Sequence, residues 1–286
     1  MLWQGRRESS NIEDVRGSGG GLAIGGGLGS LIIGLIIYLL GGNPSAVLNN
    51  NNFSDPSQQQ TQSNPADDET KQFVAVVLAD TEDVWTKLFN DMNKQYIPPK
   101  LVLFSQAVQS GCGSASAATG PFYCPQDQKV YLDMSFFQEM KDRFNAASNT
   151  PGDFAEAYVI AHEVGHHVQN LLGITDKVDA MRGRLSEKEQ NAISVKVELQ
   201  ADFLAGIWAH YDEQMKNILQ PGDIESALNA ANAIGDDRLQ KESQGYVVPD
   251  AFTHGTSAQR MYWFKKGYET GDISQGDTFN APDLNQ

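Results

Sequence analysis

Apolar residues recur at intervals of three and four along much of the chain, which is the spacing of a helix with one buried face. Two shorter apolar runs, residues 101–104 and 129–133, are rich in side chains that favour strands. The pattern predicts an α+β fold, with a mainly helical domain and a small β-sheet. The predicted helices cover residues 73–92, 151–172, 187–219, 223–234 and 257–268.

A different pattern precedes this domain. No charged residue occurs between Arg16 and Asp55, and residues 22–40 read LAIGGGLGSLIIGLIIYLL. A helix of this length spans roughly 28 Å, which is enough to cross the hydrocarbon core of a bilayer. Residues 22–41 are therefore predicted to form a transmembrane anchor ahead of the domain, and a buried helix of a water-soluble core is the alternative.

The distribution of basic residues predicts how this anchor is oriented. Arg6, Arg7 and Arg16 precede it, and the first basic residue after it is Lys71. Because basic residues accumulate on the cytoplasmic side of membrane helices, residues 1–21 are predicted to form a cytoplasmic tail. The rest of the chain is then expected to be exported.

Two further features flank the predicted anchor. Gly21, Gly25 and Gly29 lie four residues apart, as in membrane helices that associate, so self-association and a flexible approach to the membrane are both open interpretations. Residues 42–70 are dominated by Asn, Gln, Ser and Pro, which predicts a flexible linker. The folded domain is predicted to cover residues 71–286.

Composition narrows the classes of partner. The chain has 286 residues, enough for one sizeable core, and a formal net charge of −15. Such an acidic balance argues against a nucleic-acid partner, since no basic face is available for phosphates. In an exported domain, Cys112 and Cys124 are expected to form a disulfide, and a reduced pair is the alternative if the topology is inverted.

The most specific chemical signal is the sequence His162-Glu163-Val164-Gly165-His166 within a predicted helix. Helical residues four apart lie on one face, so His162 and His166 can present two imidazole nitrogens to one metal ion. Glu163 is offset by one position, where a carboxylate can act as general base on a metal-bound water. The alternative is a pair of structural histidines beside a surface glutamate.

A catalytic zinc site needs a third protein ligand and an open fourth position. A third histidine six residues further on is excluded, because Leu172 occupies that position. Glu198, on the next long predicted helix, is the better candidate. Asp202 follows four residues later and is expected to bond the far nitrogen of a ligand histidine, most simply His162. Two solvated carboxylates are the alternative, but the apolar residues around them argue for burial.

Residues outside this cluster offer further chemistry. His254 lies in a loop before the last predicted helix and could donate a hydrogen bond to the oxyanion of a tetrahedral intermediate, as could Tyr262. The alternative is that His254 only braces its loop. His167 points about 100° away from His166 on the helix and is not expected to bind the same ion. A substrate strand is expected to add beside residues 129–133 or 101–104.

Taken together, these segments resemble the bacterial neutral zinc metallopeptidase family over nearly the whole chain. The matching segments are residues 3–9, 112–113, 120–125, 161–167, 198–202 and 254–260. The resemblance implies a zincin-like domain of the glutamate-ligand kind, as in thermolysin, tethered in the bacterial inner membrane. With the orientation above, the domain would be periplasmic or extracellular.

The sequence thus predicts a membrane-anchored zinc metallopeptidase with one zinc ion per chain and a peptide or protein substrate. His162, His166 and Glu198 are the predicted ligands, and Glu163 and His254 the predicted catalytic residues. Two alternatives stay open: a non-catalytic zinc-binding envelope protein, and a zinc hydrolase of a non-peptide amide. Zinc itself is inferred from the ligand types.

Overall fold

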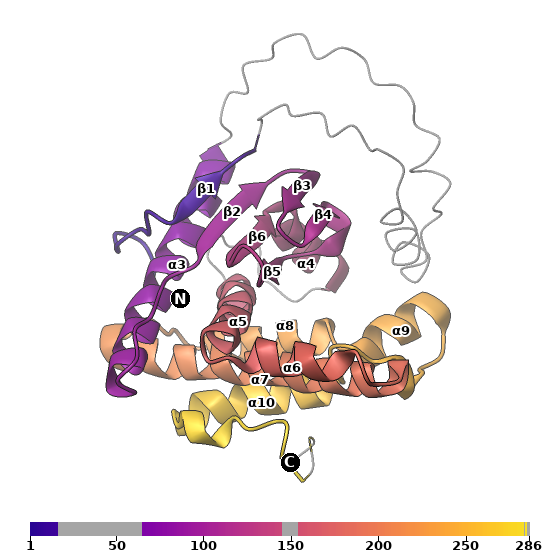
Figure 1. The fold of residues 1–286 in the computed structure, drawn as a ribbon. Helices are drawn as coiled ribbons and strands as arrows, with labels where there is room; N and C mark the ends of the chain where they lie inside the picture. The colour runs from indigo at the N-terminus through magenta and orange to yellow at the C-terminus, as the bar shows by residue number, and fades with distance from the viewer. Residues whose placement is uncertain (17–64, 145–153, 283, 285–286) are drawn as a thin grey trace, which may run out of the picture.

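The computed structural model describes residues 1–16, 65–144, 154–282 and 284. In this part of the chain a four-stranded sheet lies over a layer of helices (Figure 1). The strand order is β1-β2-β6-β5, in which β1, β2 and β6 are parallel and β5 is antiparallel to β6. A separate antiparallel hairpin contains β3 and β4. The strands are β1 (Ile12–Asp14), β2 (Lys100–Phe104), β3 (Ala107–Ser110), β4 (Gly113–Ser116), β5 (Phe122–Cys124) and β6 (Lys129–Asp133).

The helical layer is built around two helices, α5 and α7, that pack against each other beneath the sheet (Figure 1). The α-helices of the described residues are α3 (Pro65–Asp91), α4 (Ser135–Phe144), α5 (Phe154–Leu171), α6 (Ile174–Arg182), α7 (Glu187–Lys216), α8 (Asp223–Ala233), α9 (Asp236–Gln244) and α10 (Ser257–Thr270). The predicted α+β architecture is confirmed, and α3, α5, α7, α8 and α10 correspond to the helices predicted from apolar spacing.

The helix α7 is the longest element and shows why the sequence folds as it does. It begins at a capping box, in which the Ser186 hydroxyl accepts a hydrogen bond from the Glu189 amide and the Glu189 carboxylate accepts one from the Ser186 amide. It ends at Asn217, which adopts the left-handed conformation of a helix C-cap. Its middle part, from Leu199 to Ala209, is buried on every side, because α5 and α10 both pack against it.

Two glycines allow α7 and α10 to approach closely. A Cβ atom added at Gly206 would lie 2.1 Å from the carbonyl oxygen of Phe264, and one added at Gly267 would lie 2.1 Å from that of Phe203. Only hydrogen fits at these positions. The crossing is important for the site described below, because α10 carries Arg260 and α7 carries Asp202.

Replacing Gly206 by alanine is expected to destabilise the protein by about 3 kcal/mol or more, because the two helices must separate to admit the methyl group. The matched control is Gly183→Ala. Gly183 has φ −62° and no atom within 4 Å of an added Cβ, so its replacement should be neutral or slightly stabilising. Urea denaturation of both variants measures the difference, and equal stability would show that the helices are not in close contact at Gly206.

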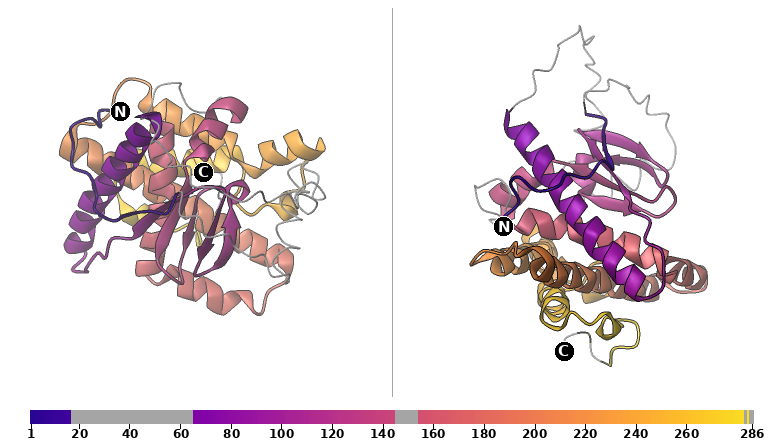
Figure 2. Two further views of the ribbon diagram at one scale, coloured as in Figure 1. Left: turned by 90° about the horizontal axis from the view of Figure 1, so that it is seen from above. Right: turned by 90° about the vertical axis from the view of Figure 1, so that its left-hand side faces the viewer.

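The first residues of the chain belong to the folded domain. Trp3 is 5% exposed and packs edge-on against Phe73 of α3, and β1 pairs with β2 inside the main sheet. Arg6 binds Asp80 of α3, with 2.7 Å between Nη2 and Oδ1. Figure 2 shows this segment running along α3 before it joins the sheet. The core of the domain is therefore incomplete without residues 1–16.

This arrangement corrects the predicted topology. A single crossing between residues 1–16 and the domain would place them on opposite sides of a bilayer, whereas β1 is a strand of the domain's own sheet. The predicted anchor, residues 22–41, and its glycines lie outside the described residues. No helix in the described ranges is both long enough and apolar enough to cross a membrane. The transmembrane helix of the predicted fold and the single-pass inner-membrane location are thus not supported.

A buried charge cluster fastens the N-terminal segment to α3 and α7. Asp80 and Asp212 are 2% and 0% exposed, and both face Lys216 and Arg6. Burial and the neighbouring Asp212 carboxylate raise the pKa of Asp80 to about 7, although Lys216 and Arg6 oppose the shift. Asp83 completes the cluster by binding Lys216 at 2.8 Å.

The raised pKa predicts a pH dependence of stability. Between pH 4 and 7, roughly, the folded state holds a proton on Asp80 that the unfolded state has released, so the free energy of unfolding falls as the pH rises. Asp80→Asn removes this titration. The stability of the wild type relative to Asp80→Asn is therefore expected to decrease across that window in urea titrations, and a difference independent of pH would contradict the assignment.

Candidate metal centre

The helix α5 places three aromatic side chains on one face. Tyr158, His162 and His166 follow one another at intervals of four residues, so they lie one helical turn apart. Gly165, between the histidines, faces α7: an added Cβ would lie 3.0 Å from the carbonyl oxygen of Ala201. This close approach brings Glu198 and the two histidines together.

The donor atoms of His162, His166 and Glu198 converge on one point. The Nε2 atom of His162 lies 3.2 Å from Oε2 of Glu198, and Nε2 of His166 lies 3.4 Å from Oε1 of the same carboxylate. One donor atom from each residue lies within 4.8 Å of the other two, and in the described part of the chain no other group of three or more such residues does so. The three predicted ligands are thus side by side.

His166 is oriented by a residue whose role the sequence did not reveal. Its Nδ1 atom lies 2.9 Å from Oε1 of Gln169, and the Gln169 amide nitrogen donates to the carbonyl of Val197. Since the amide nitrogen is used elsewhere, Oε1 accepts a hydrogen bond from Nδ1–H of His166. Its Nε2 then carries the free lone pair and faces the site, as metal ligation requires.

His162 is held by a larger buried network. Its Nδ1 atom lies 2.8 Å from Oδ1 of Asp202, off the ideal direction of the ring N–H, so the contact is chiefly electrostatic. Asp202 is fully buried and accepts from Nε and Nη2 of Arg260 at 2.8 and 2.9 Å. The Tyr158 hydroxyl donates to the same carboxylate at 2.5 Å. The structure therefore brings Asp202 to His162 as the sequence predicts, and shows that Arg260 neutralises it.

The charges around the site favour a bound cation. Burial disfavours protonation of His162, but Asp202 and Glu198 outweigh it and raise the pKa of this imidazole to about 10. Burial raises the pKa of Glu198, but His166 and His162 hold it well below its usual range. The two imidazoles bind a metal through neutral nitrogens, so metal binding competes with protons at these sites. Metal binding should release them, so the affinity should rise with pH.

Glu163 lies beside the cluster and lines a cavity next to it. The residue is 8% exposed and lines this cavity of about 610 Å³ together with His162, His166 and Glu198. The cavity is walled on one side by residues 117–123, on another by α6, and on a third by Ile234 and His254. The predicted general base therefore faces a space large enough for a substrate.

His254 also lines this cavity, and its side chain is half-exposed. Asp236, the first residue of α9, holds its loop: one carboxylate oxygen accepts hydrogen bonds from the amides of Thr253, His254 and Gly255 at 2.7, 2.6 and 3.0 Å. The other oxygen lies 3.2 Å from Nδ1 of His254. Its Nδ1–H is thereby directed at Asp236, which leaves Nε2 for the cavity.

Other residues named from the sequence lie elsewhere. Tyr262 does not line the cavity and instead packs against Trp263 and Lys266. His167 is fully buried, bonded to the carbonyl of Ile97 at 2.7 Å and to the hydroxyl of Tyr123 at 3.0 Å. Burial lowers its pKa to about 4, so it is a neutral structural residue.

The strand beside the metal helix also differs from expectation. Residues 101–104 and 129–133 form β2 and β6, which both have neighbours on either side in the sheet. The edge strand that borders the cavity is β5, which the sequence analysis missed. Its three residues are too few for an alternating pattern to be recognised.

Two histidines and a glutamate from two packed helices, beside a cavity, form a donor set that could hold a metal ion, and zinc is bound by these ligand types. The comparisons with known proteins agree. The family described as "Putative neutral zinc metallopeptidase" matches residues 1–279, and the chain belongs to this family.

Two similar proteins are described as uncharacterized. It is 50% identical over 289 residues to "Uncharacterized protein YpfJ" of Escherichia coli strain K12, covering 98% of this chain and 99% of that protein. It is 46% identical over 200 residues to "Uncharacterized protein Rv2575" of Mycobacterium tuberculosis strain H37Rv, covering 66% of this chain and 65% of that protein. No solved structure matches the chain.

Proposed function

We propose that the protein is a zinc-dependent peptidase that binds one zinc ion through His162, His166 and Glu198. The observation that carries the proposal is the convergence of these three donors beside Glu163, on the floor of a cavity of about 610 Å³. A site that only stabilised the fold would more often be closed by a fourth protein ligand. Hydrolysis needs a general base beside an open coordination position of the metal, and Glu163 is the candidate.

The residues around the donor set fit zinc. Imidazole and carboxylate are ligands that zinc accepts, and each histidine has a partner on its far nitrogen, Asp202 for His162 and Gln169 for His166. A zinc ion held there supplies a Lewis acid and lowers the pKa of water towards about 7. Arg260 balances the charge of Asp202, so the site as a whole does not accumulate uncompensated anions.

The chain's own residues then account for the proton transfers. The Glu163 carboxylate takes a proton from the attacking water as the oxygen–carbon bond forms, and delivers it to the leaving nitrogen as the carbon–nitrogen bond breaks. His254 donates from Nε2 to the oxyanion of the tetrahedral intermediate. For this donation it must be protonated on both nitrogens or hold its proton on Nε2. Burial lowers the pKa of His254, but Asp236, 3.2 Å from Nδ1, raises it and so favours the protonated form.

The proposal is tested by incubating the full-length protein with a diverse peptide library and identifying the cleaved bonds by mass spectrometry. We expect cleavage that a zinc chelator abolishes. A protein that binds zinc and captures peptides intact would instead support the non-catalytic binding role. A protein that leaves peptides untouched but hydrolyses an amide in cell-wall material would support the non-peptide alternative.

A further inference from the structure

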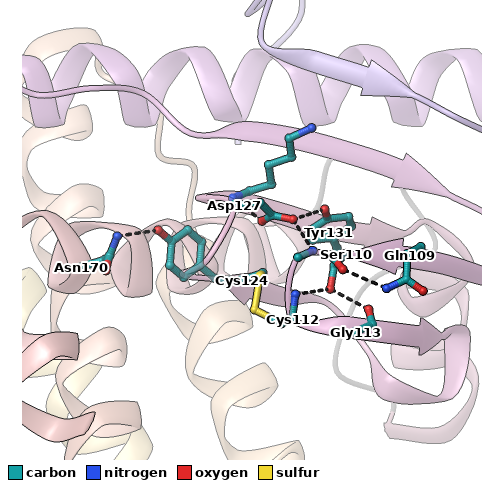
Figure 3. Close-up of a disulfide and its surroundings, with 11 residues drawn as sticks. Gln109, Ser110, Cys112, Gly113, Cys124, Asp127, Tyr131 and Asn170 are labelled. Carbon is teal, nitrogen blue, oxygen red and sulfur yellow. Dashed lines mark hydrogen bonds between the residues drawn. A yellow bond between two sulfur atoms is a disulfide. The ribbon is translucent and has the colours of Figure 1, made fainter. Parts of the chain in front are cut away.

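Cys112 and Cys124 form a disulfide that joins two separate parts of the sheet layer. Cys112 lies in the turn between β3 and β4 and is exposed, whereas Cys124 ends the edge strand β5 and is fully buried. Figure 3 shows the bond between the hairpin turn and the edge strand. The predicted pairing is therefore present, although the topology from which it was inferred is wrong.

The segment closed by this disulfide is a wall of the cavity above the metal cluster. All residues from Ala117 to Tyr123 line the cavity, as does Pro125 just beyond the bond. Residues of the helices α6, α7 and α9 and His254 also line it. A substrate bound in this cavity over Glu163 can therefore contact residues 117–123, which we call the disulfide loop.

Residues 117–121 of the disulfide loop make few contacts that hold them in place. None of its residues 117–121 is buried, and they are held by a short 3-10 turn, a hydrogen bond from the Ala117 amide to the carbonyl of Gln106, and one from the Ser116 amide to the Thr119 hydroxyl. The segments on either side, β5 and the turn of the β3–β4 hairpin, are held by more contacts. Tyr123 is bonded to His167 and Asn170 of α5, and β5 pairs with β6.

The hairpin end is fixed around the disulfide itself. The Asp127 carboxylate, which lies near the disulfide (Figure 3), accepts hydrogen bonds from the Gly111 amide at 2.6 Å and from the Tyr131 hydroxyl at 2.7 Å. The hydroxyl oxygen of Ser110 accepts a hydrogen bond from the Cys112 amide. These contacts hold the turn, and the disulfide adds a direct covalent cross-link between it and the end of β5.

We propose that the Cys112–Cys124 disulfide is a positioning element of the substrate cleft, which holds the disulfide loop in place as the wall against which a peptide binds. The inference rests on the proposed peptidase function and adds a determinant of substrate affinity. Without the bond, the hairpin turn and β5 can separate, and residues 117–121 gain conformations that do not form the wall. Part of the free energy of peptide binding is then spent on ordering the loop, so the peptide binds more weakly. The metal ligands, on α5 and α7, are unaffected.

The test compares the full-length wild type with the double variant Cys112→Ser/Cys124→Ala. Alanine is used at position 124 because the side chain is buried in an apolar cluster. Both proteins are assayed for zinc content and for kcat and KM on a peptide that the wild type cleaves. We expect one zinc per chain in both, a KM raised by about tenfold or more, and a kcat within a few-fold of the wild type.

A second measurement separates positioning from general stability. Treatment of the wild type with a phosphine, which takes oxygen from water to become its oxide and leaves two thiols, should raise KM in the same way. Reoxidation should restore the original KM, and amide hydrogen exchange at residues 113–120 should be faster in the reduced form than in the oxidised form.

The outcomes distinguish this inference from the function on which it rests. An unchanged KM in a double variant that retains its zinc would overturn the positioning role. Loss of zinc in parallel with the rise in KM would overturn it too, since the disulfide would then support the metal site. A wild-type protein that holds zinc and cleaves no peptide would remove the proposed function, and the inference with it.

Discussion

Replacing Glu163 by glutamine is expected to lower peptide cleavage by about 10²–10⁴-fold while zinc stays bound. Glutamine has nearly the same shape but cannot accept the proton of the attacking water. Glu163 is 8% exposed and lies beside the donor set without belonging to it, so its replacement should leave the three ligands in place. The rate is measured with a peptide identified from the library, and zinc by elemental analysis of the same sample.

The matched control for this variant is Glu156→Gln, two helical turns earlier on α5. Glu156 is also buried but pairs with Lys141, away from the donor set. Its replacement should affect stability more than the rate of the folded protein. Equal rates for the wild type and Glu163→Gln, at equal zinc content, would exclude Glu163 as the general base.

Replacing Glu198 by alanine is expected to lower zinc affinity by more than the roughly 10–100-fold that loss of an outer-shell partner costs. Two imidazoles alone cannot complete the coordination that zinc requires. Glu198 also lies between the two histidines, with its carboxylate oxygens 3.2 and 3.4 Å from their Nε2 atoms, so alanine removes the acidic donor shared by both. Competition with a chromophoric chelator measures the affinity.

Glu187→Gln serves as the control on the same helix. Glu187 lies in the exposed first turn of α7, far along the helix from Glu198, and its replacement should leave zinc affinity unchanged. If Glu198→Ala bound zinc as tightly as the wild type, the third ligand would have to come from another residue.

The metal cluster could be predicted from the sequence because its geometry is largely local. His162 and His166 are one helical turn apart, and Glu198 and Asp202 repeat the same spacing on α7. Once both segments are recognised as buried helices, few arrangements satisfy their polar groups. The residues that support the metal cluster were harder to predict from the sequence. Arg260, on α10, is 58 residues from Asp202 in the sequence, and Tyr158 and Gln169, on α5 itself, follow no pattern that marks them as supports of the cluster.

The parts of the fold that failed to appear in the sequence pattern are short or polar. The helix α9 reads DDRLQKESQ and has a single large apolar residue, Leu239, so no apolar stripe marks it. Yet its first residue, Asp236, positions the His254 loop. Sequence patterns report burial along one element, whereas this contact is a side chain of one element binding the backbone of another.

The topology prediction failed for a different reason. Hydropathy and the placement of Arg6, Arg7 and Arg16 were interpreted as signals for membrane orientation. In the structure the first two bind Asp80, Glu82 and Asp83, and Arg16 binds Asp14. Charges that serve as ion-pair partners within a domain have the same sequence signature as charges that orient a membrane helix. A fragment starting at Lys71 would therefore lack β1 and Trp3 of its own core, and experiments require the full chain.

The central claim, that a zinc ion held by His162, His166 and Glu198 is used to cleave peptides, is tested most directly by removing and restoring the metal. Full-length protein is stripped with a chelator, titrated with zinc, and assayed on the peptide library at each step. We expect the rate of peptide cleavage to return in proportion to added zinc and to reach its maximum at one zinc per chain. Cleavage that survives complete removal of the metal, or a fully loaded protein that cleaves no peptide, would contradict it.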